Sequence, residues 1–364
     1  MRGSNTQQVP MFSMLTPDDK VPPDHPLRRI KVIVDRALSE LSAVFDEMYA
    51  TGGRASIPPE RLLKGCLLIA LYSIRSERQL CEQLEYNLLF KWFLDMDIET
   101  PAFDATTFTK NRERLLSHEV APRFFRAVLA QAKAAHLISA EHFSVDGTLL
   151  EAWASLKSFQ PRDTGDHRPR GSAGTRNPEV DFRGAPRRND THVSTTDPEA
   201  RLFTKGFRQT AKLCYSGNVL MENRNGLVVD VLVAPADGHA ERATAVRMLQ
   251  RQRSRRRRTV AADKAYDTEA FINSCRAMQI TPQVARNITA YRGSHIDDRS
   301  ASRPGYVVGQ RIRKRVEEIF GWVKTVGGGR KLRYIGVDRN QLWAELTVTA
   351  YNLVRMSKLV PHPA

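Results

Sequence analysis

Hydrophobic positions recur at helical spacing through the first part of the chain, from Pro26 to about Phe143. An apolar helix is predicted over Leu62–Tyr72. Pro58 and Pro59, followed by the acidic Glu60, form a common helix start just before it. Further helical patterns cover residues 76–85, 88–94, 106–116 and 121–135. We therefore predict a helical domain over residues 26–140. Residues 1–25 are polar and interrupted by prolines, which predicts a mobile arm.

At His142 the apolar pattern changes from a period of 3.6 to a period of two. Phe143–Asp146 alternates apolar and polar residues, as a strand does. Two strand-like runs, Tyr215–Met221 and Leu227–Val233, flank an Asn-Gly pair that predicts a hairpin. Further strands are predicted over residues 259–263 and 280–284, and helices over residues 241–250, 268–278, 306–324 and 342–356. This order predicts a layered α/β domain over residues 141–364.

The α/β region is interrupted by a stretch of different composition. From about residue 157 to 207 the chain is rich in Pro, Gly, Arg, Asp, Ser and Thr, with few large apolar residues. A segment of this composition buries too little apolar surface to offset the entropy of ordering it. We therefore predict a flexible insertion over about residues 157–207.

Composition narrows the class of partner. The formal net charge of the 364 residues is +16, which points to nucleic acid or to an anionic membrane. The longest apolar run, Cys66–Ile74, is too short to span a bilayer, and Met1–Lys20 has no apolar signal-peptide core. The four cysteines have no zinc-site spacing, so we expect reduced thiols. A cytoplasmic protein that binds nucleic acid is the expectation.

Two aspartates follow directly on strand-like runs. Asp146 is predicted at the end of one strand and Asp263 at the end of another. In α/β sheets, ligands and chemistry gather at the carboxyl ends of strands. Carboxylates brought together there repel one another unless a cation lies between them, and Mg²⁺ favours such oxygen ligands. Taken singly, each aspartate is more simply read as a turn or cap residue after a strand.

The third candidate carboxylate comes from helix geometry. In a helix over residues 306–324, Arg313, Glu317 and Lys324 fall within about 40° of one another, beside the apolar stripe. Glu318 points more nearly towards solvent. Glu317 is therefore the better candidate for a site at the domain surface. The simpler alternative is an exposed Arg–Glu pair worth about 0.3–0.5 kcal/mol.

Together these segments resemble a known family. Arg313-x3-Glu317-x6-Lys324 is similar to the signature Tyr-x2-Arg-x3-Glu-x6-Lys of the IS4/IS5 superfamily of insertion-sequence transposases, with Gln310 at the tyrosine position. Residues 143–148 and 262–267 resemble the first and second aspartate motifs. Residues 57–97 resemble the helical N-terminal domain of IS5-type members, and residues 327–330 and 350–355 also fit. The resemblance extends from about residue 25 to 357.

The resemblance implies a ribonuclease H-like catalytic fold. The first aspartate would lie on the first strand, the second after the fourth, and the glutamate on a later helix. Asp146, Asp263 and Glu317 would hold two Mg²⁺ ions, with Mn²⁺ as a substitute, for DNA cleavage and strand transfer. The implied partners are the terminal repeats of the element and target DNA. A homodimer or larger assembly in the bacterial nucleoid is implied, with residues 26–140 serving DNA binding or assembly.

Basic residues form the candidate DNA contacts. Arg313 and Lys324 would contact phosphates near the cut, where arginine can bind in a bidentate manner. Two clusters add to them: Arg311, Lys314 and Arg315, and the run Arg255, Arg256, Arg257 and Arg258. Such contacts position DNA without reading its sequence. A charge run is often only a solvated face, but the +16 balance favours a DNA track.

Three other functions remain open from the sequence. A catalytically inactive, transposase-derived protein would only bind DNA, and the Gln310 departure keeps this alternative. A ribonuclease H-like nuclease with the same triad would cut DNA but not join it. A basic protein that associates with RNA would need no carboxylate triad at all.

Overall fold

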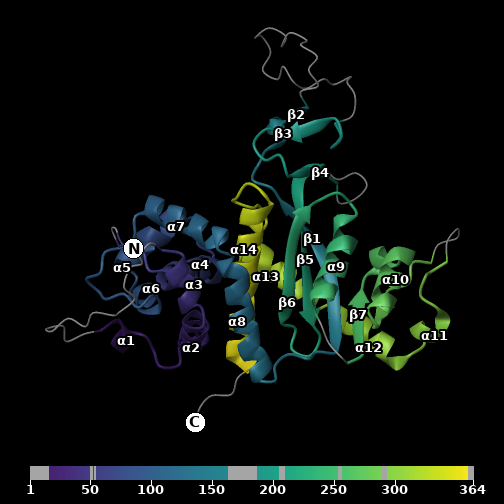
Figure 1. The fold of residues 1–364 in the computed structure, drawn as a ribbon, viewed down its shortest axis with the longest axis horizontal. Coiled ribbons are helices and arrows are strands. Elements are labelled where there is room, and N and C mark those ends of the chain that lie inside the picture. The colour runs from purple at the N-terminus through teal and green to yellow at the C-terminus, as the bar shows by residue number, and fades with distance from the viewer. Residues whose placement is uncertain are drawn as a thin grey trace, which may run out of the picture.

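The computed structural model describes residues 16–49, 52, 55–162, 187–204, 210–252, 256–288 and 293–359. Its N-terminal part is helical, as predicted (Figure 1). The helices there are α1 (Pro17–Lys20), α2 (Pro26–Ser39), α3 (Ser42–Glu47), α4 (Pro59–Leu71), α5 (Glu77–Tyr86), α6 (Leu88–Phe93), α7 (Ala105–Ser117) and α8 (Val120–Ala134). Helix α4 lies at the centre of their core, with Leu62, Leu63, Leu67 and Leu68 fully buried.

The predicted arm over residues 1–25 needs a correction at its end. Residues 16–25 include α1, which packs against α6. The Asp18 carboxylate accepts hydrogen bonds from Trp92 Nε1 at 2.6 Å and from Arg28 at 2.8 Å, and Val21 is buried. The polar pattern hides this packing, because the segment is held by polar contacts of Asp18 and Arg28 and by one buried valine, and not by an apolar stripe. Residues 1–15 lie outside the described residues.

A six-stranded mixed sheet forms the centre of the second part. Its strands are β1 (His142–Glu151), β4 (Arg201–Phe203), β5 (Lys212–Glu222), β6 (Val228–Pro235), β7 (Arg258–Ala262) and β8 (Ile280–Val284). Across the sheet the order is β6-β5-β1-β7-β8, with β4 continuing along the β6 side of β5. The pairs β6–β5 and β5–β1 are antiparallel, whereas β1–β7 and β7–β8 are parallel.

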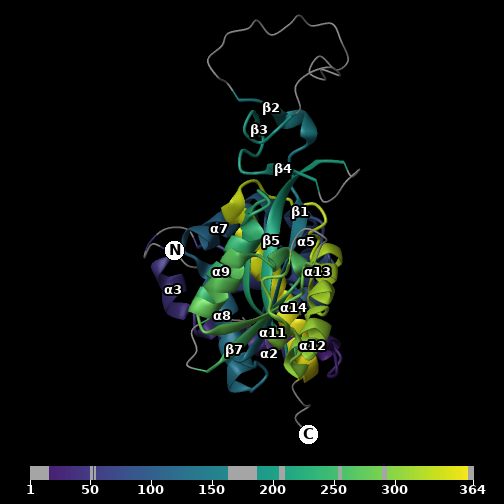
Figure 2. The same cartoon turned by 90° about the vertical axis from the view of Figure 1, so that its right-hand side faces the viewer.

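Helices cover both faces of this sheet (Figures 1 and 2). One face buries Phe143 and Val145 against α9 (Ala240–Arg251) and α10 (Glu269–Ala277). The other face packs against α12 (Pro304–Arg313), α13 (Val316–Thr325) and α14 (Val337–Leu359). Short α11 (Asp298–Ala301) precedes α12. The predicted α/β, ribonuclease H-like fold with a helical N-terminal region is confirmed.

Helix α14 belongs to both parts of the molecule. Figure 1 shows it between the N-terminal helices and the sheet. Leu342, Leu346 and Leu353 complete the core of the helical region, whereas Ala344 and Val348 pack beneath the sheet. The predicted boundary at residue 140 therefore separates the two parts along the sequence, but in the structure α14, from the second part, completes the core of the first. Within the described residues, no helix is long and apolar enough to cross a bilayer.

The predicted insertion is partly structured. Residues Leu156–Ser158 form a 3₁₀ turn, and β2 (Phe159–Pro161) pairs with β3 (His192–Ser194) beyond the end of the main sheet (Figures 1 and 2). Asp197 is fully buried and accepts a hydrogen bond from Tyr215 Oη at 2.5 Å. Residues 157–162 and 187–204 therefore contain short strands held by backbone pairing and few apolar contacts, and the flexibility of the insertion stays a prediction. Residues 163–186 and 205–207 lie outside the described residues.

Candidate active site

Asp146 and Asp263 lie at the same level on neighbouring strands. In the parallel pair β1–β7, Ser144 lies opposite Ala261, and the pairing ends there. Two residues further along each chain come Asp146 and Asp263. Side chains two residues apart project on the same face of a strand, so the register directs the two carboxylates towards one another.

The sequence predicted Asp146 at the end of a strand, but the structure places it in the middle of β1. Strand β1 continues to Glu151, because its antiparallel pairing with β5 extends that far. What ends near Asp146 is the parallel partner β7. At Asp146, β1 therefore still pairs with β5 on one edge but no longer pairs with β7 on the other. The sequence pattern marks the end of the β7 pairing, and not the end of β1.

The charge of Asp146 is sensitive to the other two candidate carboxylates. Its side chain is 17% exposed, and burial raises its pKa to about 6. The backbone N–H of Gly147, at 2.9 Å, opposes this shift, and the charges of Asp263 and Glu317 add to it. The structure thus brings the three predicted carboxylates into one electrostatic neighbourhood.

The predicted single helix over residues 306–324 is wrong. The chain forms α12 and α13, with a break at Lys314 and Arg315, so Glu317 lies in the first turn of α13. Glu317 and Glu318 are both exposed. Glu318 forms an ion pair of 3.8 Å with Arg355 on α14, whereas the charge of Glu317 acts on Asp146. The arrangement favours Glu317, although the continuous-helix geometry behind that choice does not hold.

The basic residues of the signature lie over β1. Arg313 Nη1 is 3.9 Å from Asp146 Oδ2, and its buried Nε has no hydrogen-bond partner among the described residues. Lys324 Nζ donates to Thr148 Oγ1 at 2.6 Å, two residues beyond Asp146 on the same strand. Both cations are therefore placed where a phosphate next to Asp146 would meet them.

Gln310 makes contacts beside Asp263. Its Nε2 donates to the carbonyl of Ala262 at 3.2 Å and to the carbonyl of Gln283. One turn earlier, Tyr306 Oη donates to the carbonyl of Val284 at 2.9 Å. The two side chains hold the carboxyl ends of β7 and β8, so the departure from tyrosine leaves a hydrogen-bonding group next to the site.

The remaining predicted DNA contacts divide into exposed and buried residues. Arg311, Lys314 and Arg315 are exposed around the break between α12 and α13. Arg256 and Arg257 are exposed as well, and Arg256 pairs with Glu141 at 3.0 Å. Arg255 lies outside the described residues.

Arg258 does not fit the predicted DNA contact. It is only 8% exposed, and its guanidinium donates to the carbonyls of Leu249, Gln252 and Met278 at the ends of α9 and α10. A guanidinium committed to three carbonyls is a structural group. The last arginine of the run is therefore withdrawn from the DNA-contacting set.

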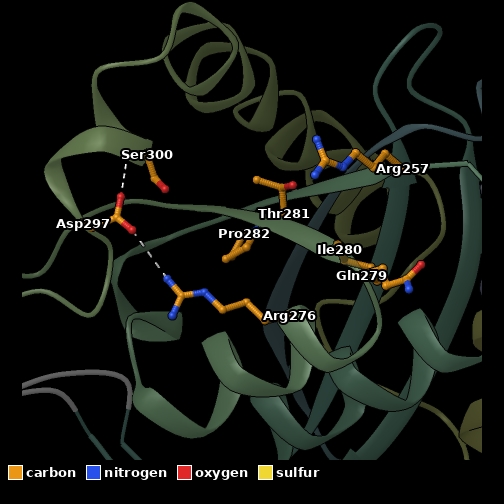
Figure 3. A pocket seen from close by; sticks show the side chains of 8 residues that line it. All are labelled: Arg257, Arg276, Gln279, Ile280, Thr281, Pro282, Asp297 and Ser300. Carbon is orange, nitrogen blue, oxygen red and sulfur yellow. Dashed lines mark hydrogen bonds and ion pairs between the residues drawn. The ribbon is translucent and has the colours of Figure 1, made fainter.

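One open hollow on the surface lies away from the carboxylates. It has a volume of about 820 Å³ and is open to solvent at the start of β8, where Arg257 and Arg276 face it (Figure 3). Asp297 lies in it too, 3.8 Å from Arg276. Because Ile280 pairs with Arg258 at the beginning of both strands, this hollow is at the opposite end of β7 and β8 from Asp263.

Two further groups near the carboxylates were missed from the sequence. Glu241, in the first turn of α9, is partly buried, and its pKa is raised to about 7 by this burial and by the charges of Asp146 and Asp263. Tyr266 is fully buried, and its hydroxyl has no hydrogen-bond partner among the described residues. Tyr266 lies within the second aspartate motif, residues 262–267, but nothing in the motif indicates a role for it, and Glu241 belongs to no local pattern.

The donor set fits a divalent cation. Within the described residues, no three His, Cys, Asp or Glu side chains are gathered closely enough to hold a metal as they stand. However, burial and the charge of Asp263 raise the pKa of both Asp146 and Glu241, and the Tyr266 hydroxyl has no hydrogen-bond partner among the described residues. Mg²⁺ commonly takes only one or two carboxylates, with waters and substrate phosphates completing its shell. An oxygen-only site of this kind suits Mg²⁺ or Mn²⁺ and not a thiolate-binding metal.

Two protein families match this chain. The model described as "Transposase domain (DUF772)" matches residues 15–114, and that described as "Transposase DDE domain" matches residues 190–353. The chain is therefore a transposase that carries a DDE domain. The combination of the two domains identifies it as a DDE transposase of the insertion-sequence type, which functions in DNA transposition. No curated protein matches the chain in sequence.

Solved transposase structures are only distantly similar. A piggyBac transposase synaptic complex with hairpin DNA is 10% identical, with 91% of this chain and 75% of that chain covered and a TM-score of 0.41. A Mos1 mariner paired-end complex with Mn is 12% identical, with 93% and 97% covered and a TM-score of 0.20. With such scores these similarities add nothing to the assignment, which rests on the two family matches.

The matched ranges bear unequally on the three carboxylates. Asp263 and Glu317 lie inside the DDE-domain match, whereas Asp146 lies between the two matched ranges. The case for Asp146 is therefore carried by geometry: the β1–β7 register, the contact with Arg313, and the charges of Asp263 and Glu317.

Proposed function

We propose that this transposase cleaves the ends of an insertion sequence and joins them to target DNA by metal-dependent phosphoryl transfer. Asp146, Asp263 and Glu317 are the proposed catalytic and metal-binding residues. The observation that carries this proposal is the register of β1 and β7, which directs Asp146 towards Asp263 within reach of the charge of Glu317.

Each residue has a distinct part in the proposed reaction. The three carboxylates supply the negative charge for two Mg²⁺ ions, with Mn²⁺ as a substitute. When bound, such ions activate a water or a 3′-hydroxyl and stabilise the leaving oxygen of an in-line displacement. Arg313 and Lys324 neutralise and orient the phosphate next to Asp146. Arg311, Lys314 and Arg315 extend this basic surface along the DNA backbone.

The assembly follows from the reaction. The proposed substrates are the terminal inverted repeats of the element and target DNA, in duplex form. Two ends must be held together for joining, so we propose a homodimer or larger complex, with residues 26–140 serving DNA binding or assembly. Among insertion-sequence transposases, we propose that the chain belongs to the IS4/IS5 superfamily. Its proposed location is the bacterial cytoplasm, at the nucleoid.

The test is strand cleavage by Asp146→Asn on a DNA fragment that carries one element end, with Mg²⁺. We expect loss of cleavage by a factor of about 10³ or more, because the site loses a charged metal ligand. DNA binding should stay within about twofold of wild type. Asp297→Asn, which removes an exposed carboxylate at the far end of β8, is the matched control. An Asp146→Asn variant that cuts in Mg²⁺ would remove Asp146 from the site.

A strand-transfer assay separates this proposal from its rivals. The match to a transposase DDE domain does not favour an inactive DNA-binding descendant or a simple nuclease. An inactive protein would neither cut nor join, and a nuclease would cut without joining the freed 3′-hydroxyl to a second duplex.

A further inference from the structure

We propose that Glu241 is a fourth carboxylate of the metal-binding set, reaching Asp146 and Asp263 from the opposite face of the sheet. This inference rests on the proposed function, because it assigns a further residue to the same site. Glu241 belongs to none of the sequence motifs, and its role follows from where α9 begins.

The fold brings the start of α9 to the carboxylates. Strand β6 runs parallel to β1, since each is antiparallel to β5, and α9 begins just after β6 ends. The first turn of α9 therefore lies near the carboxyl end of β7, beside the part of β1 that carries Asp146 and Gly147. Val145 packs against α9 on this face of β1, and Gly147, two residues further, has the same orientation.

Gly147 makes room for the Glu241 side chain. A β-carbon on Gly147 would lie 2.7 Å from Glu241 Cγ and 2.7 Å from Asn218 Oδ1, and would overlap Glu241 Oε1. The Glu241 carboxylate thus occupies the space above Gly147, the residue next to Asp146. Because β7 has already ended at Ala262, no further residue of that strand separates this carboxylate from Asp263.

The buried hydroxyl of Tyr266 is an independent sign of a ligand at this place. The negative charges that act on it are those of Glu241, Asp146 and Asp263, in that order, and Arg242 acts on it in the opposite sense. It has no hydrogen-bond partner among the described residues. Leaving a buried hydroxyl unpaired costs about 1–3 kcal/mol. With a cation bound, this hydroxyl could form a hydrogen bond with a carboxylate that binds the cation or with a water held by it.

A purely structural role explains less. An acidic residue in the first turn stabilises a helix dipole, which requires neither burial nor a missing side chain at Gly147. Among the described residues Glu241 forms no ion pair. Its neighbour Arg242 instead donates to the carbonyl of Ala265 at 3.3 Å and contacts His239 at 3.0 Å. A partly buried carboxylate beside two others and without an ion-pair partner is arranged to share a cation with them.

The experiment measures binding of Mn²⁺ alone to the full chain, by electron paramagnetic resonance of the free ion. We expect Glu241→Gln to weaken Mn²⁺ affinity about tenfold. Gly147→Ala should weaken it similarly, because the added methyl group displaces the carboxylate. The matched control is Glu345→Gln, which changes another partly buried glutamate whose pKa is raised to about 7, on α14 and away from the site. It should bind Mn²⁺ as wild type does.

The outcomes separate this inference from the proposed function. If Asp146→Asn and Asp263→Asn lose Mn²⁺ while Glu241→Gln retains wild-type affinity, Glu241 is not a ligand and the triad stands. If the wild type itself binds no Mn²⁺ through Asp146 and Asp263, the proposed function fails as well. Should Glu241→Gln not fold, Glu241→Asp and Gly147→Ala decide. The double variant of Gly147→Ala and Glu241→Gln should be no weaker than either single change.

Discussion

The two ends of the parallel strands β7 and β8 carry different sets of charged residues: the candidate carboxylates gather at one end, and exposed arginines lie at the other. At the carboxyl ends, Asp146, Asp263 and Glu241 are all partly buried. At the amino ends, Arg256 and Arg257 are exposed, and the open hollow begins there. A chain with a net charge of +16 thus places its proposed chemistry at a local concentration of negative charge.

Helix direction accounts for part of this difference. Helices α9 and α10 run back between parallel strands, so they begin at the carboxyl ends of the strands and end at the amino ends. Helix N-termini carry partial positive charge and favour anions, whereas C-termini favour cations. Glu241 lies in the first turn of α9, and Arg258 donates to carbonyls at the end of the same helix. The same dipole stabilises the acid at one end and the arginine at the other.

The largest effect should come from the acidic end. We expect Asp263→Asn to lower the rate of strand cleavage by about 10³-fold or more, because a neutral amide cannot replace a charged metal ligand. DNA affinity, measured by fluorescence anisotropy in the same buffer, should change less than twofold. A loss of DNA binding equal to the loss of cleavage would mean that the carboxylates act as fold or binding residues, and the comparison between the two ends would break.

The second effect concerns stability at the basic end. Arg258→Met should destabilise the protein by about 3 kcal/mol in urea unfolding, because three carbonyls at helix ends lose a charged donor. Arg257→Met, one residue earlier and exposed, is the matched control and should stay within about 0.5 kcal/mol. If Arg258→Met keeps full stability but loses DNA affinity, Arg258 belongs to the DNA-contacting group after all.

The third effect tests whether the acidic end is unfavourable without a cation. The pKa of Asp146 is raised from 3.8 to about 6 in the folded protein, so folding binds a proton between these values. Wild-type stability therefore falls as pH rises from about 4 to 6, and the loss is complete above 6. Metal-free Asp146→Asn should be more stable than wild type by about 2 kcal/mol at pH 7.5, and equal to it below pH 4.

Thermal unfolding with and without Mn²⁺ checks this prediction. Saturating Mn²⁺ should reverse the difference, since an ion that binds only the folded wild type stabilises it. A metal-free Asp146→Asn protein that melts below wild type at pH 7.5 would show that the charge of Asp146 is compensated within the chain itself.

Much of this site could be predicted from the sequence because it lies in contiguous patterns. Asp263 directly follows a short apolar strand, and Glu317 and Lys324 keep a fixed spacing on one helix. Their neighbours in the chain are also their neighbours in space. The α/β order and the helical N-terminal region are predictable for the same reason, since periodicity reports local structure.

Contacts between distant segments could not be predicted in this way. Glu241 becomes part of the site only through the antiparallel order of β1, β5 and β6, which no local pattern encodes. The break after Arg313 passes unnoticed because Lys314 and Arg315 are good helix formers. Arg258 looked like its neighbours in the run, and only the ends of α9 and α10 distinguish it. Burial depends on tertiary packing, which residue type alone does not determine.

The smallest effect should come from the exposed arginines. Replacing Arg256 and Arg257 together by Gln should weaken DNA affinity about fivefold, which is about 1 kcal/mol, because two phosphate contacts are lost. The slope of log affinity against log salt should fall in magnitude by about 2, since each phosphate contact contributes about 0.9. Cleavage at saturating DNA should stay at the wild-type rate, because these residues lie at the opposite end of β7 from Asp263. If the slope of log affinity against log salt does not change, the arginines at the amino ends of β7 and β8 are only solvated and do not contact DNA. Only the carboxyl ends of these strands would then face DNA.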